Sequence, residues 1–309
     1  MCAAKRAETA ATAGPGRLLS PSRSLVGMPL IALLMAATLG TSAYVLWLRY
    51  GAQILAGPDY QLTPDRIEIP PLPSWIRADV RREAILRGSL EQLDIRQPDL
   101  TVRVAQAFAL HPWVQKVTRV SKNYPAALHV ELTYRRPAAM VEVAHGLLPV
   151  DEEGVLLPTD DFTPEGARRY PRIVAGDSSP VGPPGTPWGS SHVAGAARIA
   201  GLLGPQWDRL QLYRVVVAPR DPDSSGQNAP LYELWTRRGT RILWGRAPGE
   251  ESPGEATAAE KIHRLVQYVA QHGPLDKLSD RPPQTIDVRE ARQMTVEPRT
   301  ARRDAPGDP

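Results

Sequence analysis

The most prominent feature of the hydropathy pattern is a run without charged residues at positions 24–48, between Arg23 and Arg49. As a helix rising ~1.5 Å per residue it would be about 37 Å long, which exceeds the hydrocarbon core of a bilayer, about 30 Å. Tyr44 and Trp47 lie near one end, where aromatic side chains gather at the membrane interface. The run predicts one uncleaved transmembrane helix, because it is longer than the apolar part of about 7–15 residues in a signal peptide.

Beyond this run, the pattern of apolar and polar residues predicts a compact unit at residues 66–135. Two amphipathic helices are expected, because apolar residues recur there every three or four positions. Asp99 is the expected N-cap of the second helix, which ends before Pro112. Phe108 and Trp113 are expected in the core. Strands are expected at residues 66–69, 113–120 and 128–134, which gives the order strand–helix–helix–strand–strand.

A second, larger unit is expected at residues 136–298. Two helices are predicted at 193–203 and 256–271, the second with a clear apolar face. Strand-like runs, separated by Gly, Pro and acidic turns, lie at residues 138–143, 147–150, 155–157, 172–174, 212–217, 232–236, 241–244, 285–288 and 294–296. The fold class is therefore predicted to be α+β, with an antiparallel sheet that carries helices on one face. Residues 299–309 have no apolar residues besides two alanines and are expected to form a disordered tail.

Charge adds an orientation to this scheme. The segment at residues 1–23 has four basic residues against one acidic residue, Glu8. The positive-inside rule places this segment in the cytoplasm and the folded part outside it. The same segment supplies most of the formal net charge of +4, so the rest is nearly neutral, which argues against a nucleic-acid partner. The single cysteine, Cys2, excludes an intrachain disulfide.

The sequence contains little that predicts catalysis. The motifs HExxH, CxxC, GxSxG, GxGxxG and the P-loop are absent, and the six histidines lack the spacing of metal ligands. The Ser-Ser-His sequence at 190–192 is expected to cap the following helix. The acidic residues 151–153 are expected in a solvated turn, and Arg135 with Arg136 in a solvated domain junction. We therefore predict no catalytic residues, no bound cofactor, no metal site and no enzymatic activity.

The last strand-like residues, 286–296, are expected at an edge of the sheet. An edge strand presents unpaired N–H and C=O groups, which another chain can complete. Charged residues along this segment either guard the edge against unwanted pairing or select a partner strand by complementarity. The residues alone leave both interpretations open. Lys261 and Arg264, on the expected exposed face of helix 256–271, would add to such a site.

Several short motifs occur in the order found in one family of bacterial proteins. The motif HPWV at 111–114 is followed by VTRV, a Tyr-Pro turn and RRPA at 135–138, with Tyr134 where the family has Glu. Further matching segments lie at residues 149–157, 170–176, 234–245, 261–265 and 286–289. Together, behind a single membrane anchor, they resemble the FtsQ/DivIB family of cell-division proteins, which have a POTRA domain followed by a β-rich domain.

The resemblance implies a bitopic scaffold of the division machinery in the inner membrane, single-pass type II, with its N-terminus in the cytoplasm. It implies that FtsB-like and FtsL-like single-pass proteins add a β-strand at the closing edge, that other divisome members also bind, and that septal wall synthesis is thereby coupled to the division site. The expected partner-binding residues are Ile286, Val288, Arg289, Glu290, Arg292, Met294, Val296, Lys261 and Arg264. The Pro-rich insertions at 177–189, 219–230 and 246–255 depart from the family pattern.

Two alternatives belong to other classes. One is a membrane-anchored extracytoplasmic hydrolase, which requires a carboxylate cluster or a Ser-His pair in a cleft. The other is a POTRA protein of secretion or outer-membrane assembly. Such proteins usually have tandem POTRA repeats or a C-terminal barrel, whereas this sequence predicts one POTRA-like unit and shows no ten-residue barrel repeats.

Overall fold

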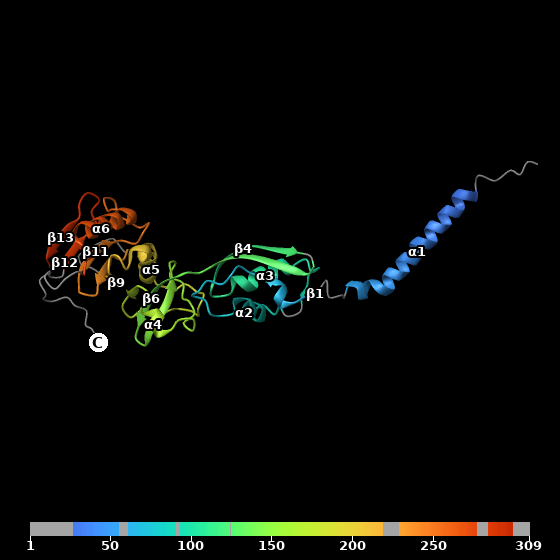
Figure 1. The fold of residues 1–309 in the computed structure, drawn as a ribbon, viewed down its shortest axis with the longest axis horizontal. Coiled ribbons are helices and arrows are strands. Elements are labelled where there is room, and N and C mark those ends of the chain that lie inside the picture. Colours follow the sequence, from blue (N-terminus) through green and yellow to red (C-terminus); the bar gives the residue numbers. More distant parts are fainter. Residues whose placement is uncertain are drawn as a thin grey trace, which may run out of the picture. The chain divides into compact units, whose positions relative to one another are not determined.

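The computed structural model describes residues 27–55, 61–90, 93–123, 125–218, 229–276 and 284–298. The chain consists of two compact units, Met1–Gly57 and Pro58–Pro309. The first contains helix α1 (Gly27–Leu55; Figure 1), in which Pro29–Gly51 is long and apolar enough, by length and composition, to cross a membrane. A single apolar N-terminal helix is thus present, as predicted. The expected tails at 1–23 and 299–309 lie outside the described residues.

The second unit begins with a first lobe, residues 61–135, which has the predicted order of elements. Helices α2 (Val80–Arg87) and α3 (Leu100–Ala109) share a core with a three-stranded sheet. Phe108 and Trp113 are fully buried in that core, as predicted. The sheet has the spatial order β2 (Ile67–Glu68), β5 (Ala127–Tyr134), β4 (Val114–Asn123), and a separate pair joins β1 (Gln61–Leu62) to β3 (Leu93–Asp94).

Local sequence signals account for the helix starts in this lobe. Asp79 caps α2, because its carboxylate accepts a hydrogen bond from the backbone N–H of Arg82 at 3.1 Å. Asp99 occupies the N-cap of α3, as predicted, but its side chain accepts no capping hydrogen bond. The sequence therefore predicts which residue occupies the N-cap position, but not whether its side chain makes the capping hydrogen bond.

The second lobe, residues 136–298, is built on an eight-stranded sheet. Helices α5 (Ser191–Leu203) and α6 (Ala258–His272) share its core, and the short helix α4 (Pro164–Ala167) precedes β8. In spatial order the strands are β13 (Thr295–Pro298), β12 (Gln284–Asp287), β11 (Arg241–Gly245), β10 (Tyr232–Thr236), β9 (Leu212–Val217), β8 (Arg172–Val174), β6 (Pro137–Val143) and β7 (Gly146–Asp151). The predicted division of the unit at residues 135 and 136 stays a prediction.

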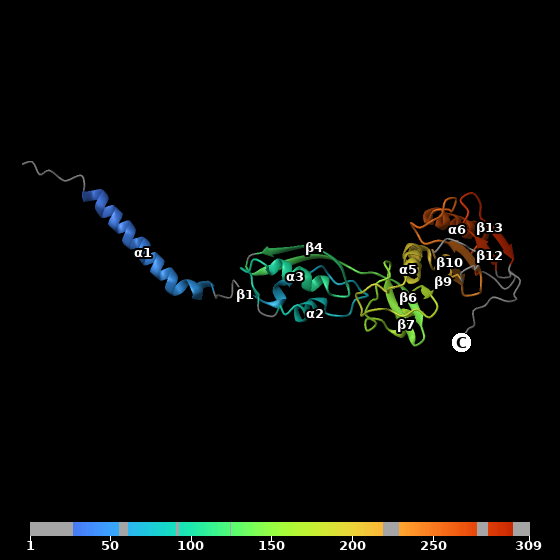
Figure 2. The same cartoon turned by 180° about the vertical axis from the view of Figure 1, so that it is seen from behind.

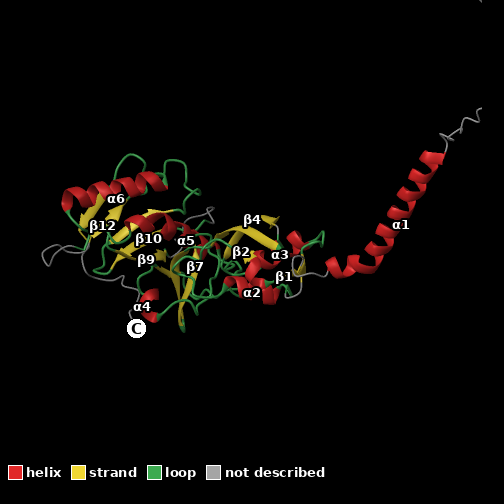
Figure 3. Ribbon diagram, turned by 45° about the vertical axis from the view of Figure 1, so that its right-hand side comes forward, coloured by secondary structure: helices red, strands yellow, loops and turns green. Residues whose placement is uncertain are grey.

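One row of apolar residues crosses this sheet and forms the centre of the core. Paired in register, and all buried, are Val141, Ile173, Val215, Leu234, Ile242 and Ile286. Both α5 and α6 pack into the same core cluster, so both helices cover the face to which this row belongs (Figure 3). The α+β class and the single helical face are confirmed.

The sheet is mixed, whereas an antiparallel sheet was expected. The pairs β6–β8, β8–β9 and β11–β12 are parallel. A parallel pair needs a long crossover connection, usually a helix. Helix α5 lies between β8 and β9, and α6 lies between β11 and β12, whereas the connection from β6 to β8 contains strand β7 and the short helix α4. For two of the three parallel pairs, the position of a long helix in the sequence therefore accounts for the direction of pairing.

For the loops of this lobe, the expected strand at residues 155–157 is wrong, whereas the expected cap position at residues 190–192 is confirmed without its hydrogen bond. Residues 155–157 form no regular strand, only isolated bridges from Val155 to Pro187 and from Leu156 to Val150. Ser190 is the N-cap residue of α5, but its side chain makes no capping hydrogen bond. The segment 155–157 is apolar because it packs inward, since Leu157 is fully buried in the core of the first lobe.

A buried carboxylate joins the two lobes. Asp161 of the second lobe accepts hydrogen bonds from the backbone N–H groups of Arg77 and Ala78, at 2.7 and 2.8 Å. It also accepts one from Nε1 of Trp113, at 2.7 Å. Phe162 packs beside that indole, with ring centroids 6.1 Å apart. Trp113 is thus both a core residue of the first lobe and a contact to the second.

An ion pair forms the second connection between the lobes. Nη1 of Arg135 lies 2.6 Å from Oδ2 of Asp151, and both side chains are largely buried. The other carboxylate oxygen of Asp151 accepts hydrogen bonds from the backbone N–H groups of Glu153 and Val155. The expected solvated turn and solvated junction are therefore wrong for these two residues, which are desolvated because they satisfy each other.

Candidate partner-binding edge

The second lobe ends in an exposed edge strand. β13 is the outermost strand of the sheet (Figure 2), and each of its four residues is exposed. It pairs antiparallel with β12, with Val296 opposite Ile286. Among the described residues, no strand pairs with the other side of β13. Its outward N–H and C=O groups are the kind of surface that a further strand can complete.

Val296 gives this edge an apolar element. It continues the buried row of the core by one strand, because it is in register with Ile286. Ile286 is fully buried, whereas Val296 is 37% exposed. The core pattern thus extends to the outermost strand, where the side chain is partly open to solvent.

The structure corrects the expectation that the whole segment 286–296 lies at the edge of the sheet. Ile286 belongs to β12, an interior strand between β11 and β13, and both Ile286 and Val288 are fully buried. Between the two strands the chain forms a connection in which Glu290 makes an isolated bridge to Glu255. Arg292 is exposed in this connection and belongs to no strand. Of the expected residues, only Val296 lies in the edge strand itself.

Two other expected residues support the core and the connection. Met294 is partly buried against the core cluster. Arg289 forms an ion pair with Asp287, with Nη2 and Oδ2 2.6 Å apart. Burial raises the pKa of Asp287, but the hydrogen bonds and charge of Arg289 outweigh it and hold that pKa below its usual range. The charge of Arg289 is therefore already balanced within the chain.

Helix α6 lies beside β12 (Figure 3). It begins with a complete capping box. The hydroxyl of Thr257 accepts from the backbone N–H of Glu260, and the Glu260 carboxylate accepts from the backbone N–H of Thr257 at 2.8 Å. Leu265 and Val269 face the core. This position lets side chains of α6 contact the connection between β12 and β13.

Lys261 is not on the exposed face of α6, which corrects the prediction. Its side chain is fully buried, and Nζ lies 2.6 Å from Oε1 of Glu255 and 5.1 Å from the centroid of the Trp244 ring. Burial raises the pKa of Glu255, but hydrogen bonds from Lys261 and from the backbone N–H groups of Ser252 and Arg246 outweigh it, so that pKa is lowered. Lys261 therefore holds the loop before α6 in place, and no partner can reach it without unfolding.

Arg264 is also engaged within the chain. Its guanidinium donates to the backbone oxygen of Glu290 at 2.6 Å and to that of Ala291. The backbone N–H of Ala256 donates to the oxygen of Arg289 at 2.7 Å, which ties the same connection to the start of the helix. Arg264 thus positions the segment that leads into β13.

Sequence reasoning missed Glu255, although it is the central acceptor of this region. Nothing in its local sequence marks it, because Glu255 lies in a loop and its donors come from both sides along the chain, namely the backbone N–H groups of Arg246 and Ser252 and the side chain of Lys261 in α6. The burial of Lys261, in contrast, could be predicted from the sequence, since it is spaced by four residues from Leu265 and by eight from Val269 on the core face.

Among the described residues, no group of three or more His, Cys, Asp or Glu side chains could hold a metal ion.

These features define an α+β protein with one apolar helix fit to span a membrane and an exposed sheet edge. No family model matches the chain. It is 32% identical over 130 residues to the cell division protein FtsQ of Streptomyces bingchenggensis (strain BCW-1). These aligned residues are 41% of this chain and 42% of that protein. It is 28% identical over 176 residues to the cell division protein FtsQ of Anaeromyxobacter sp. (strain K). These aligned residues are 56% of this chain and 53% of that protein.

The chain spans about half the length of the curated relatives it matches. The two similarities support an FtsQ-type cell-division protein, and they confirm the resemblance predicted from the order of the sequence motifs. One apolar helix fits a membrane-anchored member of this group.

Proposed function

We propose that the chain is a bitopic, non-catalytic scaffold of the bacterial division machinery in the inner membrane. Its N-terminal segment lies in the cytoplasm, and the second unit lies outside at the division site. There it binds FtsB-like and FtsL-like single-pass proteins, and it couples septal wall synthesis to this site. The similarity to the two FtsQ proteins and the apolar helix α1 support this assignment.

The observation that carries the proposal is the free side of β13. A partner strand that pairs there gains main-chain hydrogen bonds along the edge and can cover the exposed Val296. Arg264 and Arg289 act indirectly, because they hold the connection that positions this strand. Arg292, exposed beside it, is free to meet an acidic side chain of the partner.

Proline substitutions in β13 test this mode of binding. In an antiparallel strand the N–H groups point alternately toward and away from the neighbouring strand. Of two adjacent changes, Val296→Pro and Glu297→Pro, one removes an outward donor and the other an inward one. The outward change should abolish capture of an FtsB-like partner while the second unit stays folded.

Val296→Ala is the matched control, because it shortens the side chain but keeps the backbone N–H. We expect it to weaken capture only moderately. The measurement is a pull-down of the partner with the full chain in detergent, with circular dichroism to monitor folding. Equal recovery with both proline variants would remove strand addition at β13 from the proposal.

A further inference from the structure

The second lobe has an open cleft that the proposed function does not use. Its volume is about 490 Å³, and a smaller cavity of about 240 Å³ adjoins it, since both are lined by Arg169, Tyr170, Trp207 and Asp208. Pockets that hold ligands have volumes of about 300–1,000 Å³. Because the two cavities share four lining residues, they lie next to each other, and together they offer an extended chain more surface than a compact small molecule would cover.

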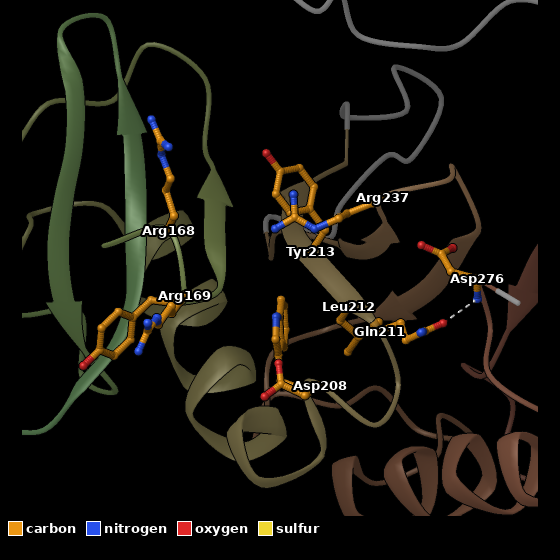
Figure 4. Close-up of a pocket in the computed structure, with 10 residues that line it drawn as sticks. Arg168, Arg169, Asp208, Gln211, Leu212, Tyr213, Arg237 and Asp276 are labelled. Carbon is orange, nitrogen blue, oxygen red and sulfur yellow. Dashed lines mark hydrogen bonds between the residues drawn. The ribbon is translucent and has the colours of Figure 1, made fainter. Parts of the chain in front are cut away.

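Three arginines from two separate segments line the larger cavity. Arg168 and Arg169 follow helix α4, and Arg237 lies in the turn between β10 and β11. Figure 4 shows Arg168 and Arg169 on one side of the cleft and Tyr213 with Arg237 across from them. The guanidinium carbon of Arg237 lies 4.3 Å from the centroid of the Tyr213 ring, a cation–π contact that holds this side chain in place.

The acidic residues of the larger cavity only partly offset these charges. Oδ2 of Asp276 accepts a hydrogen bond from the backbone N–H of Arg238 at 3.1 Å, and its other oxygen is enclosed. Gln211 uses its side-chain oxygen to accept from the backbone N–H of Asp276, as the dashed line in Figure 4 marks, so its NH₂ group remains as a donor. Asp208 is the one exposed carboxylate among the described lining residues. The cleft therefore presents mainly donors, and its ligand must supply acceptors.

The pattern of charges favours carboxylates carried on a peptide. A guanidinium binds a carboxylate through two parallel hydrogen bonds. Arg136, in the smaller cavity, extends the row of arginines, while Glu152 and Asp208 lie in the same cavity. These two carboxylates would repel a polymer with a negative charge on every unit, but they can accept hydrogen bonds from peptide N–H groups. We propose that this cleft binds an extended acidic peptide segment, whose carboxylates meet Arg168, Arg169 and Arg237.

The site is separate from β13, so its test does not depend on the proposed function. The probe is a fluorescent peptide of four Gly-Glu repeats, titrated with the full chain in nanodiscs of uncharged lipid and followed by anisotropy. We expect saturable binding that weakens as the salt concentration rises. A Gly-Gln peptide of equal length should bind at least tenfold more weakly.

Charge reversal locates the binding. The double variant Arg168→Glu with Arg237→Glu should weaken binding of the Gly-Glu peptide at least tenfold, and the double glutamine variant should also weaken it severalfold. Arg119→Glu, an exposed arginine on β4, is the matched control and should change the affinity less than twofold. Equal binding by all variants, or tighter binding of polyphosphate or polygalacturonate than of the peptide, would overturn the proposal.

Discussion

Nζ of Lys261 lies 2.6 Å from Oε1 of Glu255, and this pair is buried below the ring of Trp244. The contact joins helix α6 to the loop that precedes it. Two backbone hydrogen bonds join the same loop to the connection between β12 and β13. The N–H of Ala291 donates to the oxygen of Gly254, and the N–H of Ala256 donates to the oxygen of Arg289. An internal ion pair therefore supports the approach to the proposed edge without touching a partner.

Loss of one member of this pair should destabilise the second unit strongly. Lys261→Met leaves the Glu255 carboxylate buried without its cation, which typically costs about 3–5 kcal/mol. Adding Glu255→Gln should recover part of the loss, because the neutral amide still accepts hydrogen bonds. Denaturant unfolding of the full chain in detergent measures both. Gln267→Met, at an exposed position of the same helix, should change stability by less than about 0.5 kcal/mol.

The contribution of Glu255 should also depend on pH. Its folded-state pKa lies below the ordinary value of 4.5, so the ionised carboxylate stabilises the fold above that pH. The contribution is lost as the pH falls through the folded-state pKa. The difference in unfolding free energy between the native chain and Glu255→Gln should therefore shrink in acid. A difference that grows below pH 4.5 would contradict this account of the pair.

The junction between the lobes should depend on Asp161. Asp161→Ala leaves two backbone N–H groups and the indole N–H of Trp113 without their acceptor. Buried unpaired donors cost about 1–3 kcal/mol each, so we expect a loss of about 3 kcal/mol or more in thermal or denaturant unfolding. Asp160→Ala, at the exposed neighbouring position, is the control and should have little effect. Equal stabilities of the two variants would show that the carboxylate does not hold the lobes together.

The orientation in the membrane has a direct test. A reporter that is active only in the cytoplasm should be silent when fused after Pro309 and active when fused before Met1. The expectation follows from the excess of basic residues at positions 1–23 and the apolar stretch Pro29–Gly51. Cytoplasmic activity of the C-terminal fusion would contradict the proposed topology.

The spacing of apolar residues predicted most helices and strands of the fold, because an element that is buried on one face has apolar residues at the period of that element. The helix expected at 256–271 is α6, and the strands expected at 172–174, 212–217 and 232–236 have these limits in the structure. The parallel pairs were missed because strand periodicity does not encode the direction of pairing. Two of the three follow instead from the long helices α5 and α6 that lie between the paired strands.

The candidate site was predicted less well than the fold. Residues 286–296, which include the two strand-like runs 285–288 and 294–296, were expected together at the edge of the sheet. In the structure, Ile286 and Val288 complete the core, and the chain then turns before β13. Lys261 was expected on the exposed face of the helix, although its spacing of four residues from Leu265 matches the core face. Its partner Glu255 comes from a loop, and such a contact has no periodic signal in the sequence.

The central claim is that a partner adds a strand to β13, and hydrogen exchange at single amides tests it most directly. The amides of Thr295, Val296 and Glu297 should be followed in the full chain, with and without an FtsB-like protein. The account predicts that the outward-facing amides of this strand become strongly protected on binding, while exchange in β4, the long strand of the first lobe, does not change. Binding of the partner with unchanged exchange at all three amides would contradict strand addition at this edge.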